Sequence, residues 1–274
     1  MSKKPSFFGR FYLSLIMLFL YAPIFVLIVF SFNSSRSRTV WSGFSLEWYQ
    51  RLFTDGTILN SLYTTLVIAT LAAVISTILG TMAAIGFYNM RSRWKTPLTQ
   101  INNIPMMNAD IVTGVSLSLL FISLGTFLGF RLGFGTLLLA HIVFCIPYVV
   151  LAIMPKLRQT DRHLIDAACD LGCTWMQAFW KVVIPEIRPG IINGLIISFT
   201  LSIDDFVISY FTAGGNIMTL PMQIFAMTRR RVSPEINALS TLLFLSVLIL
   251  LIVINVRGAR QEEKLRKRAA ALKN

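Results

Sequence analysis

Residues 62–88 read LYTTLVIATLAAVISTILGTMAAIGFY, a stretch without a charged side chain. A helix needs about 20 mostly apolar residues to cross the hydrocarbon core of a bilayer, so this stretch is long enough to span one. Five other stretches are similar to it. The six stretches together are residues 11–32, 62–88, 104–128, 135–154, 191–213 and 238–256. Each is continuously apolar, without a period of two, which excludes a β-barrel. The sequence therefore predicts an all-α, polytopic membrane protein with six transmembrane helices, the first of them uncleaved.

The composition indicates a protein surrounded mostly by lipid. Of the 274 residues, 55% are hydrophobic and 14% are charged, whereas soluble domains carry roughly 25% charged residues. The formal net charge is +13, but the basic residues lie between the apolar stretches and form no single patch, which argues against nucleic-acid binding. Cys169, Cys173 and His163 lie close in sequence, but a metal site needs about four ligands and we find no fourth. We expect no metal.

Lysine and arginine are distributed unequally over the connecting segments. With the N-terminus inside, the inner segments hold 18 Lys and Arg and the outer segments hold seven. Because such residues concentrate on the cytoplasmic side of a membrane, we expect both termini in the cytoplasm. Residues 1–60 then form the first transmembrane helix and an outer loop. Residues 61–256 form a five-helix core with a cytoplasmic loop at 156–190, and residues 257–274 form a basic cytoplasmic tail.

Three smaller patterns accompany this topology. In the outer loop, one helical face is shared by Trp48, Tyr49, Leu52 and Phe53, which predicts an amphipathic helix at the outer interface. A second outer segment contains Arg229, Arg230 and Arg231, which form either a docking patch for an acidic partner or a solvated loop. Small residues recur every fourth position at Ala72, Ser76, Gly80 and Ala84, and this spacing favours close packing between helices.

The cytoplasmic loop is too polar to span the membrane and carries a distinct pattern. It begins Asp166-Ala167-Ala168, reaches Gly172 after three more residues, and continues through nine residues to Val182-Val183-Ile184-Pro185. We expect two short helices joined at Gly172, where glycine permits a turn that a side chain would obstruct, and Pro185 should end the second. That helix carries large apolar side chains at Trp175, Met176, Phe179 and Trp180. Exposed aromatic surface of this kind marks a protein interface.

This pattern resembles the loop of ABC importer permeases written E-A-A-x3-G-x9-I-x-L-P. Asp166 replaces Glu, Val182 replaces Ile and Ile184 replaces Leu, while the spacing is kept. The resemblance implies a type I importer permease whose loop seats on a cytoplasmic ATPase dimer. Its coupling residues would be Asp166, Ala167, Ala168, Gly172, Trp175, Phe179 and Pro185. The sequence has no GxxxxGK[ST] phosphate loop, so we expect no enzymatic activity and no cofactor on this chain, with ATP bound by the partner ATPase.

Acidic side chains inside the apolar stretches indicate the cargo. Asp204 and Asp205 lie in the fifth stretch, which holds no Lys or Arg, and Asp110 lies near the inner end of the third. A charge at a helix centre costs about 2.5–3.5 kcal/mol to insert, so it usually faces a cavity or a partner. Phe206 and Tyr210 could hold a cation through their rings. Asp110 could instead be a helix-dipole residue, and the paired acids could face a cation on a partner permease.

A wider resemblance covers nearly the whole chain. Residues 30–35, 140–147, 198–205 and 232–238 are similar to the second permease of spermidine/putrescine importers. This resemblance implies a bacterial inner-membrane subunit that moves polyamines by alternating access. Its partners would be a homologous permease, two copies of an ATPase and an extracytoplasmic polyamine-binding protein. The alternatives are an importer permease for another solute, a stand-alone secondary transporter, and a membrane scaffold without a transport role.

Overall fold

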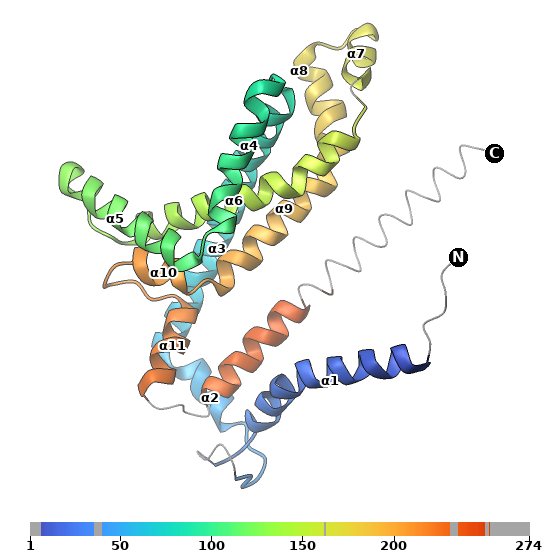
Figure 1. Cartoon of the computed structure of the whole chain (residues 1–274). Helices are drawn as coiled ribbons and strands as arrows, with labels where there is room; N and C mark the ends of the chain where they lie inside the picture. Colours follow the sequence, from blue (N-terminus) through green and yellow to red (C-terminus); the bar gives the residue numbers. More distant parts are fainter. Residues whose placement is uncertain (1–6, 36–39, 162, 231–234, 250–251, 253–274) are drawn as a thin grey trace. The chain divides into compact units, whose positions relative to one another are not determined.

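The computed structural model describes residues 7–35, 40–161, 163–230, 235–249 and 252 (Figure 1). Regular structure in these residues is helical, apart from an isolated β-bridge between Asn33 and Phe44. The all-α prediction is therefore confirmed. The chain divides into two units, residues Met1–Leu59 with Ile224–Asn274 and residues Asn60–Gln223, and each is described by itself.

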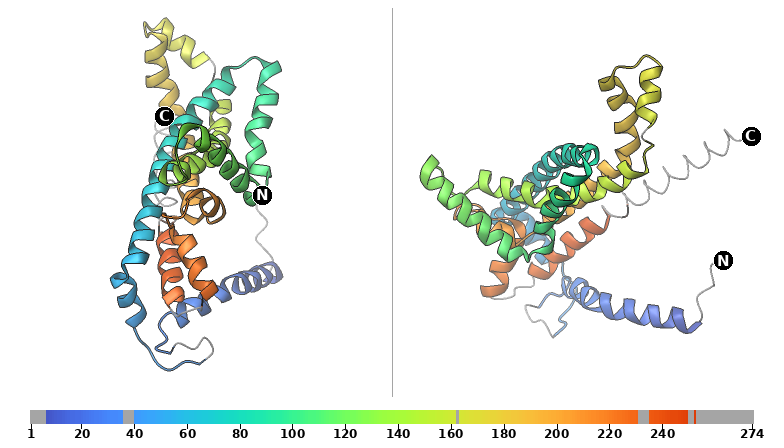
Figure 2. Two further views of the ribbon diagram at one scale, coloured as in Figure 1. Left: turned by 90° about the vertical axis from the view of Figure 1, so that its left-hand side faces the viewer. Right: turned by 45° about the horizontal axis from the view of Figure 1, so that its top comes forward.

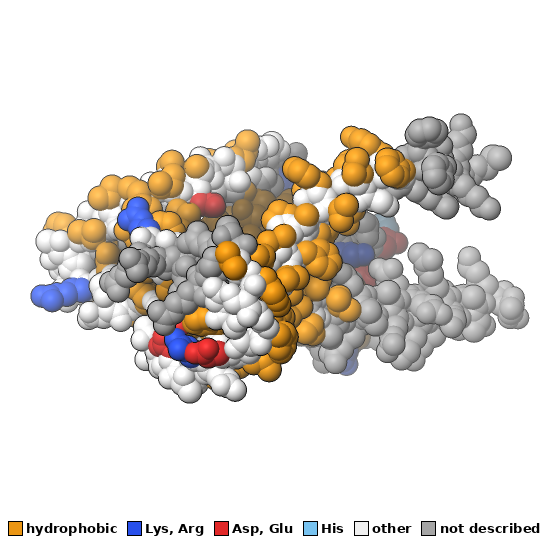
Figure 3. Space-filling view, turned by 90° about the horizontal axis from the view of Figure 1, so that it is seen from below, with side chains coloured by type: hydrophobic (Ala, Val, Ile, Leu, Met, Phe, Trp, Pro, Cys, Tyr) orange, Lys and Arg blue, Asp and Glu red, His pale blue; other side chains and the backbone are white. Residues whose placement is uncertain are grey.

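Apolar side chains cover much of the helix surface. Five of the described helices are long and apolar enough to cross a membrane. Phe19 is 81% exposed and Phe127 is 91% exposed, and Figure 3 shows hydrophobic side chains spread over one face with few charged groups among them. Exposed apolar area of this extent is unfavourable in water and is explained by a lipid environment.

The first unit contains α1 (Phe7–Phe30), α2 (Glu47–Thr54) and a helix at Glu235–Ile249. The turn after α1 is organised by Asn33, whose amide Nδ2 donates to the Val40 carbonyl at 2.8 Å and whose Oδ1 accepts from the Ser42 N–H at 2.9 Å. Trp48 donates from its indole nitrogen to the Asn33 carbonyl at 2.7 Å. Together these bonds hold α2 against the turn after α1.

The outer-loop prediction holds only in part. α2 forms where expected, but Trp48 and Leu52 are buried within the first unit, while Phe53 is exposed. Part of the apolar face is therefore covered by protein, so the helix does not present that whole face to the lipid interface.

Two sets of sequence predictions fall partly on undescribed residues. Arg229 places its guanidinium 5.0 Å from the centre of the Phe225 ring, whereas the Arg230 side chain and Arg231 lie outside the described residues. The expected tail at 257–274 and the end of the sixth predicted span, at 250–251 and 253–256, also lie outside them.

The second unit is built around α6 (Phe134–Gln159), which packs along α9 (Ile184–Asp204) (Figure 1). Most of α3 (Gly56–Asn89) belongs to the same unit. A Cβ atom on Gly80 would lie 2.7 Å from Val149 of α6, and one on Gly194 would lie 3.1 Å from it. Three helices therefore approach closely through glycine, as small-residue spacing predicts for membrane helices.

Two predicted spans are broken in this unit. The third divides into α4 (Ser92–Met107) and α5 (Asp110–Leu128), and the fifth divides into α9 and α10 (Val207–Thr212). α11 (Leu220–Arg230) follows. A two-residue interruption inside an apolar stretch leaves its mean hydropathy high, so the sequence pattern predicted continuous helices. Helix breaks of this kind occur in transporters where backbone lines a cavity or is covered by protein.

Candidate functional site

The segment between α6 and α9 forms a helical hairpin. It consists of α7 (His163–Asp170), α8 (Trp175–Ala178) and the π-helical turn η1 (Phe179–Val183), which continues into α9. Figure 2 shows this hairpin at the ends of α6 and α9.

Gly172 forms the bend of the hairpin. Its φ angle is +88°, a conformation that glycine adopts without the steric penalty that a Cβ atom imposes. The Gly172 N–H donates to the Cys169 carbonyl at 2.9 Å, and the Cys173 N–H donates to the Ala168 carbonyl at 3.0 Å. These two bonds are the Schellman motif that ends a helix, so the loop turns sharply and reproducibly at this residue.

The second arm begins with a capping box. The Thr174 hydroxyl accepts from the Gln177 N–H at 3.3 Å, and the Gln177 side chain accepts from the Thr174 N–H at 3.1 Å. This reciprocal pairing satisfies two N–H groups that the start of a helix otherwise leaves unpaired. The Schellman motif that ends α7 and the capping box that begins α8 thus fix the angle between the two arms of the hairpin.

The aromatic side chains of the hairpin divide into two groups. Trp175 and Trp180 are 57% and 61% exposed, and Leu171 at the tip is 86% exposed. Phe179 instead packs on the buried cluster formed by α3, α6 and α9. Phe179 therefore anchors the hairpin, while Leu171, Trp175 and Trp180 are exposed at its surface.

The other predicted coupling residues also differ in exposure. Asp166 and Ala167 are exposed, whereas Ala168 is buried. Pro185 does not end the helix, and that expectation is wrong. The Ile184 N–H donates to the Phe179 carbonyl, five residues back, and this wide π turn directly precedes the proline. Because Pro185 lies in the first turn of α9, its missing N–H is tolerated there.

The break between α9 and α10 contains both acids of the fifth predicted span. α9 ends at Asp204, whose side chain is exposed, and Asp205 follows it. The carboxylate of Asp205 accepts from the Ile208 N–H at 3.2 Å and from the Ser209 N–H at 2.8 Å. Asp205 therefore caps the start of α10, as an acidic residue at this position commonly does.

Asp205 also faces a buried histidine of α6. Its Oδ2 lies 3.6 Å from Nε2 of His141, a side chain that is 1% exposed. The His141 ring nitrogens lie 2.7 Å from Ser202 Oγ and 3.0 Å from Ser209 Oγ. Although the fifth stretch holds no Lys or Arg, Asp205 therefore has a polar neighbour on another helix of the chain. His141 is the hydrogen-bonded packing residue that joins the two sides of the break.

The second helix break lies beside the first. Asp110 is the first residue of α5, and α5 packs on α10 at Gly114, where a Cβ atom would lie 3.4 Å from the Ile208 backbone. Asp204 and Asp205 lie at the break that precedes α10, the helix on which α5 packs. Asp110 therefore lies at the second helix break, and its place near the inner end of the membrane stays a prediction.

Aromatic rings border this acidic group. Phe206 and Tyr210 have ring centres 5.5 Å apart, and Tyr210 is 53% exposed. On α6, Tyr148 lies within electrostatic range of Asp110 and packs on Phe144 with ring centres 5.5 Å apart. Sequence reasoning missed Tyr148, since only the fold brings α6 next to the start of α5. Carboxylates beside exposed rings are suited to organic cations.

Long apolar helices, a hairpin with exposed aromatic residues, and acids at two adjoining helix breaks define a multi-pass membrane transport component. The sequence profile of the binding-protein-dependent transport system inner membrane component family matches residues 76–267. The chain belongs to this family, and it is an inner-membrane protein of several spans.

Curated relatives are similar over most of the chain. The putrescine transport system permease protein PotI of Escherichia coli (strain K12) is 42% identical over 82% of this chain and 81% of its own length. The spermidine/putrescine transport system permease protein PotC of Haemophilus influenzae is 39% identical over 86% of this chain and 90% of its own length. These identities agree with the family assignment.

Solved structures show the same fold at low identity. A bacterial ABC transporter involved in the import of the acidic polysaccharide alginate matches with a TM-score of 0.70 and 16% identity, over 93% of this chain and 99% of that chain. The MetNI methionine ABC transporter matches with a TM-score of 0.57 and 19% identity, over 74% of this chain and 93% of that chain. The fold is that of an ABC importer permease.

Proposed function

We propose that the chain is the transmembrane permease subunit of an ATP-driven importer that moves polyamines into the cytoplasm. The observation that carries the proposal is the group of three acids, Asp110, Asp204 and Asp205, at two adjoining helix breaks. The curated relatives named for putrescine and spermidine transport support the same cargo class.

The acidic group would act as a weak cation station. A polyamine carries several protonated amines, and the exposed carboxylates of Asp204 and Asp110 would neutralise them in turn while Tyr210 offers a ring face. Asp205 already accepts two backbone N–H bonds, so its part is to hold the break in shape. Weak binding favours transport because a tightly bound ion cannot leave.

Energy for the cycle would come from a separate subunit. The exposed surface of Leu171, Trp175 and Trp180 would seat in a groove of a cytoplasmic ATPase, and Phe179 would transmit its movement to α6 and α9. We propose two ATPase copies, a homologous permease and an extracytoplasmic binding protein as partners. One solved structure of similar fold is an alginate transporter in complex with a periplasmic protein. We propose that both termini and the hairpin lie in the cytoplasm, as the distribution of Lys and Arg predicts.

Transport by the assembled importer tests the cargo assignment. The four-component complex is reconstituted into vesicles, and uptake of labelled putrescine and spermidine is measured with ATP supplied on the ATPase side. We expect ATP-dependent uptake that unlabelled polyamines suppress and that amino acids, sugars and anions do not. Uptake that an anion or a sugar suppresses, with no effect of polyamines, would contradict the proposal.

A further inference from the structure

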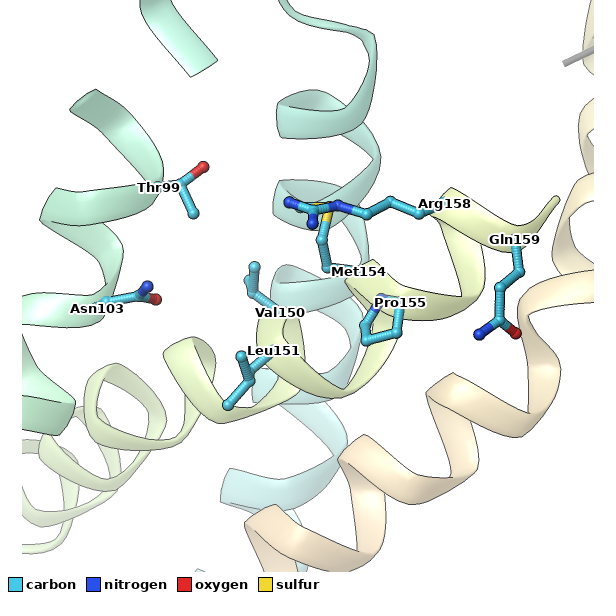
Figure 4. A pocket seen from close by; sticks show the side chains of 8 residues that line it. All are labelled: Thr99, Asn103, Val150, Leu151, Met154, Pro155, Arg158 and Gln159. Atoms are coloured by element: carbon cyan, nitrogen blue, oxygen red, sulfur yellow. The ribbon is translucent and has the colours of Figure 1, made fainter. Parts of the chain in front are cut away.

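A cavity of about 410 Å³ lies between α4 and the C-terminal half of α6 (Figure 4). It belongs neither to the acidic group nor to the hairpin. α4 contributes two polar side chains, Thr99 and Asn103, and these face α6 across the opening. The remaining lining comes from α6, with Val150, Leu151, Met154, Pro155, Arg158 and Gln159.

The α6 wall changes character along its length. Val150, Leu151 and Met154 form an apolar floor, and Arg158 with Gln159 forms a polar end. Eight residues separate Val150 from Arg158, which is about 12 Å along a helix. A ligand that fills this cavity therefore needs an apolar part and a polar part.

The position of the cavity along α6 sets its depth in the bilayer. α6 has 26 residues and is about 39 Å long, which exceeds the hydrocarbon thickness of about 30 Å. One end of α6 must therefore reach the headgroup region, and the basic residues of its last turn favour that end. Arg158 lies in this turn, about 25 Å along the helix from His141. The polar end of the cavity thus lies at the membrane surface and its apolar floor lies within the hydrocarbon.

The charge of the cavity selects an anionic ligand. Among the described residues Arg158, the basic residue that lines the cavity, forms no ion pair with a carboxylate. The Asn103 side chain accepts from Asn102 through Oδ1, which leaves its amide N–H₂ group as a donor. Cationic cargo is disfavoured beside this guanidinium group, whereas a phosphate diester would be attracted to it.

We propose that this cavity binds an anionic phospholipid, with the phosphate at Arg158 and Asn103 and the first acyl carbons against Val150, Leu151 and Met154. The apolar floor distinguishes a lipid from a free phosphate, which would leave that surface in contact with water. Bound lipid would fill the space between α4 and α6. This space must change in size if the two helices move relative to each other during transport. The proposal does not depend on the identity of the cargo.

Lipid retention by the intact importer tests the site. The complex is placed in nanodiscs with equal parts of phosphatidylglycerol and phosphatidylcholine, then purified, and co-purifying lipid is identified by native mass spectrometry. We expect selective retention of phosphatidylglycerol and a loss of about fivefold in Arg158→Gln, since one basic residue near the surface contributes about 1 kcal/mol to anionic lipid binding. Arg158→Lys should keep most of the retention. Arg188→Gln is the control, because it removes an exposed basic side chain of α9 outside the cavity.

A photoreactive side chain at position 151 gives a readout that does not require the Arg158 variants to fold. Leu151 is 53% exposed and lines the floor. A cross-link of phospholipid mass that disappears on exchange into phosphatidylcholine alone supports the proposal. A cross-link to a neighbouring polypeptide would overturn it, because the cavity would then be a subunit interface. Equal phosphatidylglycerol retention by wild type, Arg158→Gln and Arg188→Gln would also overturn it.

Discussion

Substitution of Gly172 tests the shape of the hairpin without changing the side chains that the hairpin exposes. The residue has a φ of +88°, and a Cβ atom built there would meet no other atom of the chain within 4 Å. The cost of a side chain is therefore conformational. For an L-residue in this region it is about 1–2 kcal/mol, which corresponds to a factor of roughly 5–30 in the population of the bent hairpin.

In three replacements of Gly172, the loss of ATPase binding should increase with this conformational cost. Gly172→Asn should be nearly neutral because asparagine tolerates the left-handed region. Gly172→Ala should reduce ATPase association about 5–30-fold, and Gly172→Val should reduce it further because β-branched residues are least tolerant there. The assay measures binding of the purified ATPase to the inserted permease, with hydrogen exchange over residues 163–178 as a report on the bend. Equal binding by the Asn and Val variants would refute the reasoning.

The remaining predictions concern packing, capping and docking. Gly80→Ala should cost about 1–3 kcal/mol of stability because the new methyl group would contact Val149. Gly86→Ala has open space around it and should be neutral or gain up to about 1 kcal/mol. Thermal unfolding in detergent compares the stability of the two variants. Asp205→Ala should cost about 1–2 kcal/mol through loss of the α10 cap, while Asp205→Asn should keep most of it; equal melting temperatures would contradict this. Trp180→Ala should leave stability within about 0.5 kcal/mol but weaken ATPase binding by about 2 kcal/mol, and unchanged binding would remove Trp180 from the interface.

The sequence predicted the helices well and their interruptions poorly. Length and hydropathy located each apolar stretch, because a membrane helix must be long and apolar whatever it packs against. The breaks after Met107 and Asp204 depend on local capping and on neighbouring helices. The carboxylate of Asp205 makes the α10 start favourable, but its partner His141 is separated from Ser202 and Ser209 by 61 and 68 residues. No local pattern contains that information.

The hairpin shows the same division between local and distant information. The bend at Gly172 and the start at Thr174 follow from residues within one or two turns, so their positions could be read from the chain. The π turn before Pro185 could not, because the rule that proline ends a helix ignores a helix whose preceding turn has widened. The division of the aromatic residues into the partly buried Phe179 and the exposed Trp180 depends on where α3 and α6 end.

Uptake by an Asp204→Asn importer tests the central claim most directly. Asp204 is the exposed acid at the α9 break, and the substitution keeps its size while removing its charge. We predict normal amounts of assembled complex and lower uptake of both polyamines, with spermidine affected more than putrescine because it carries more charge. Glu47→Gln, which removes an exposed acid of α2 outside the acidic group and the hairpin, is the matched control and should transport normally. Normal uptake of both polyamines by Asp204→Asn and by the double variant with Asp110→Asn would contradict the account.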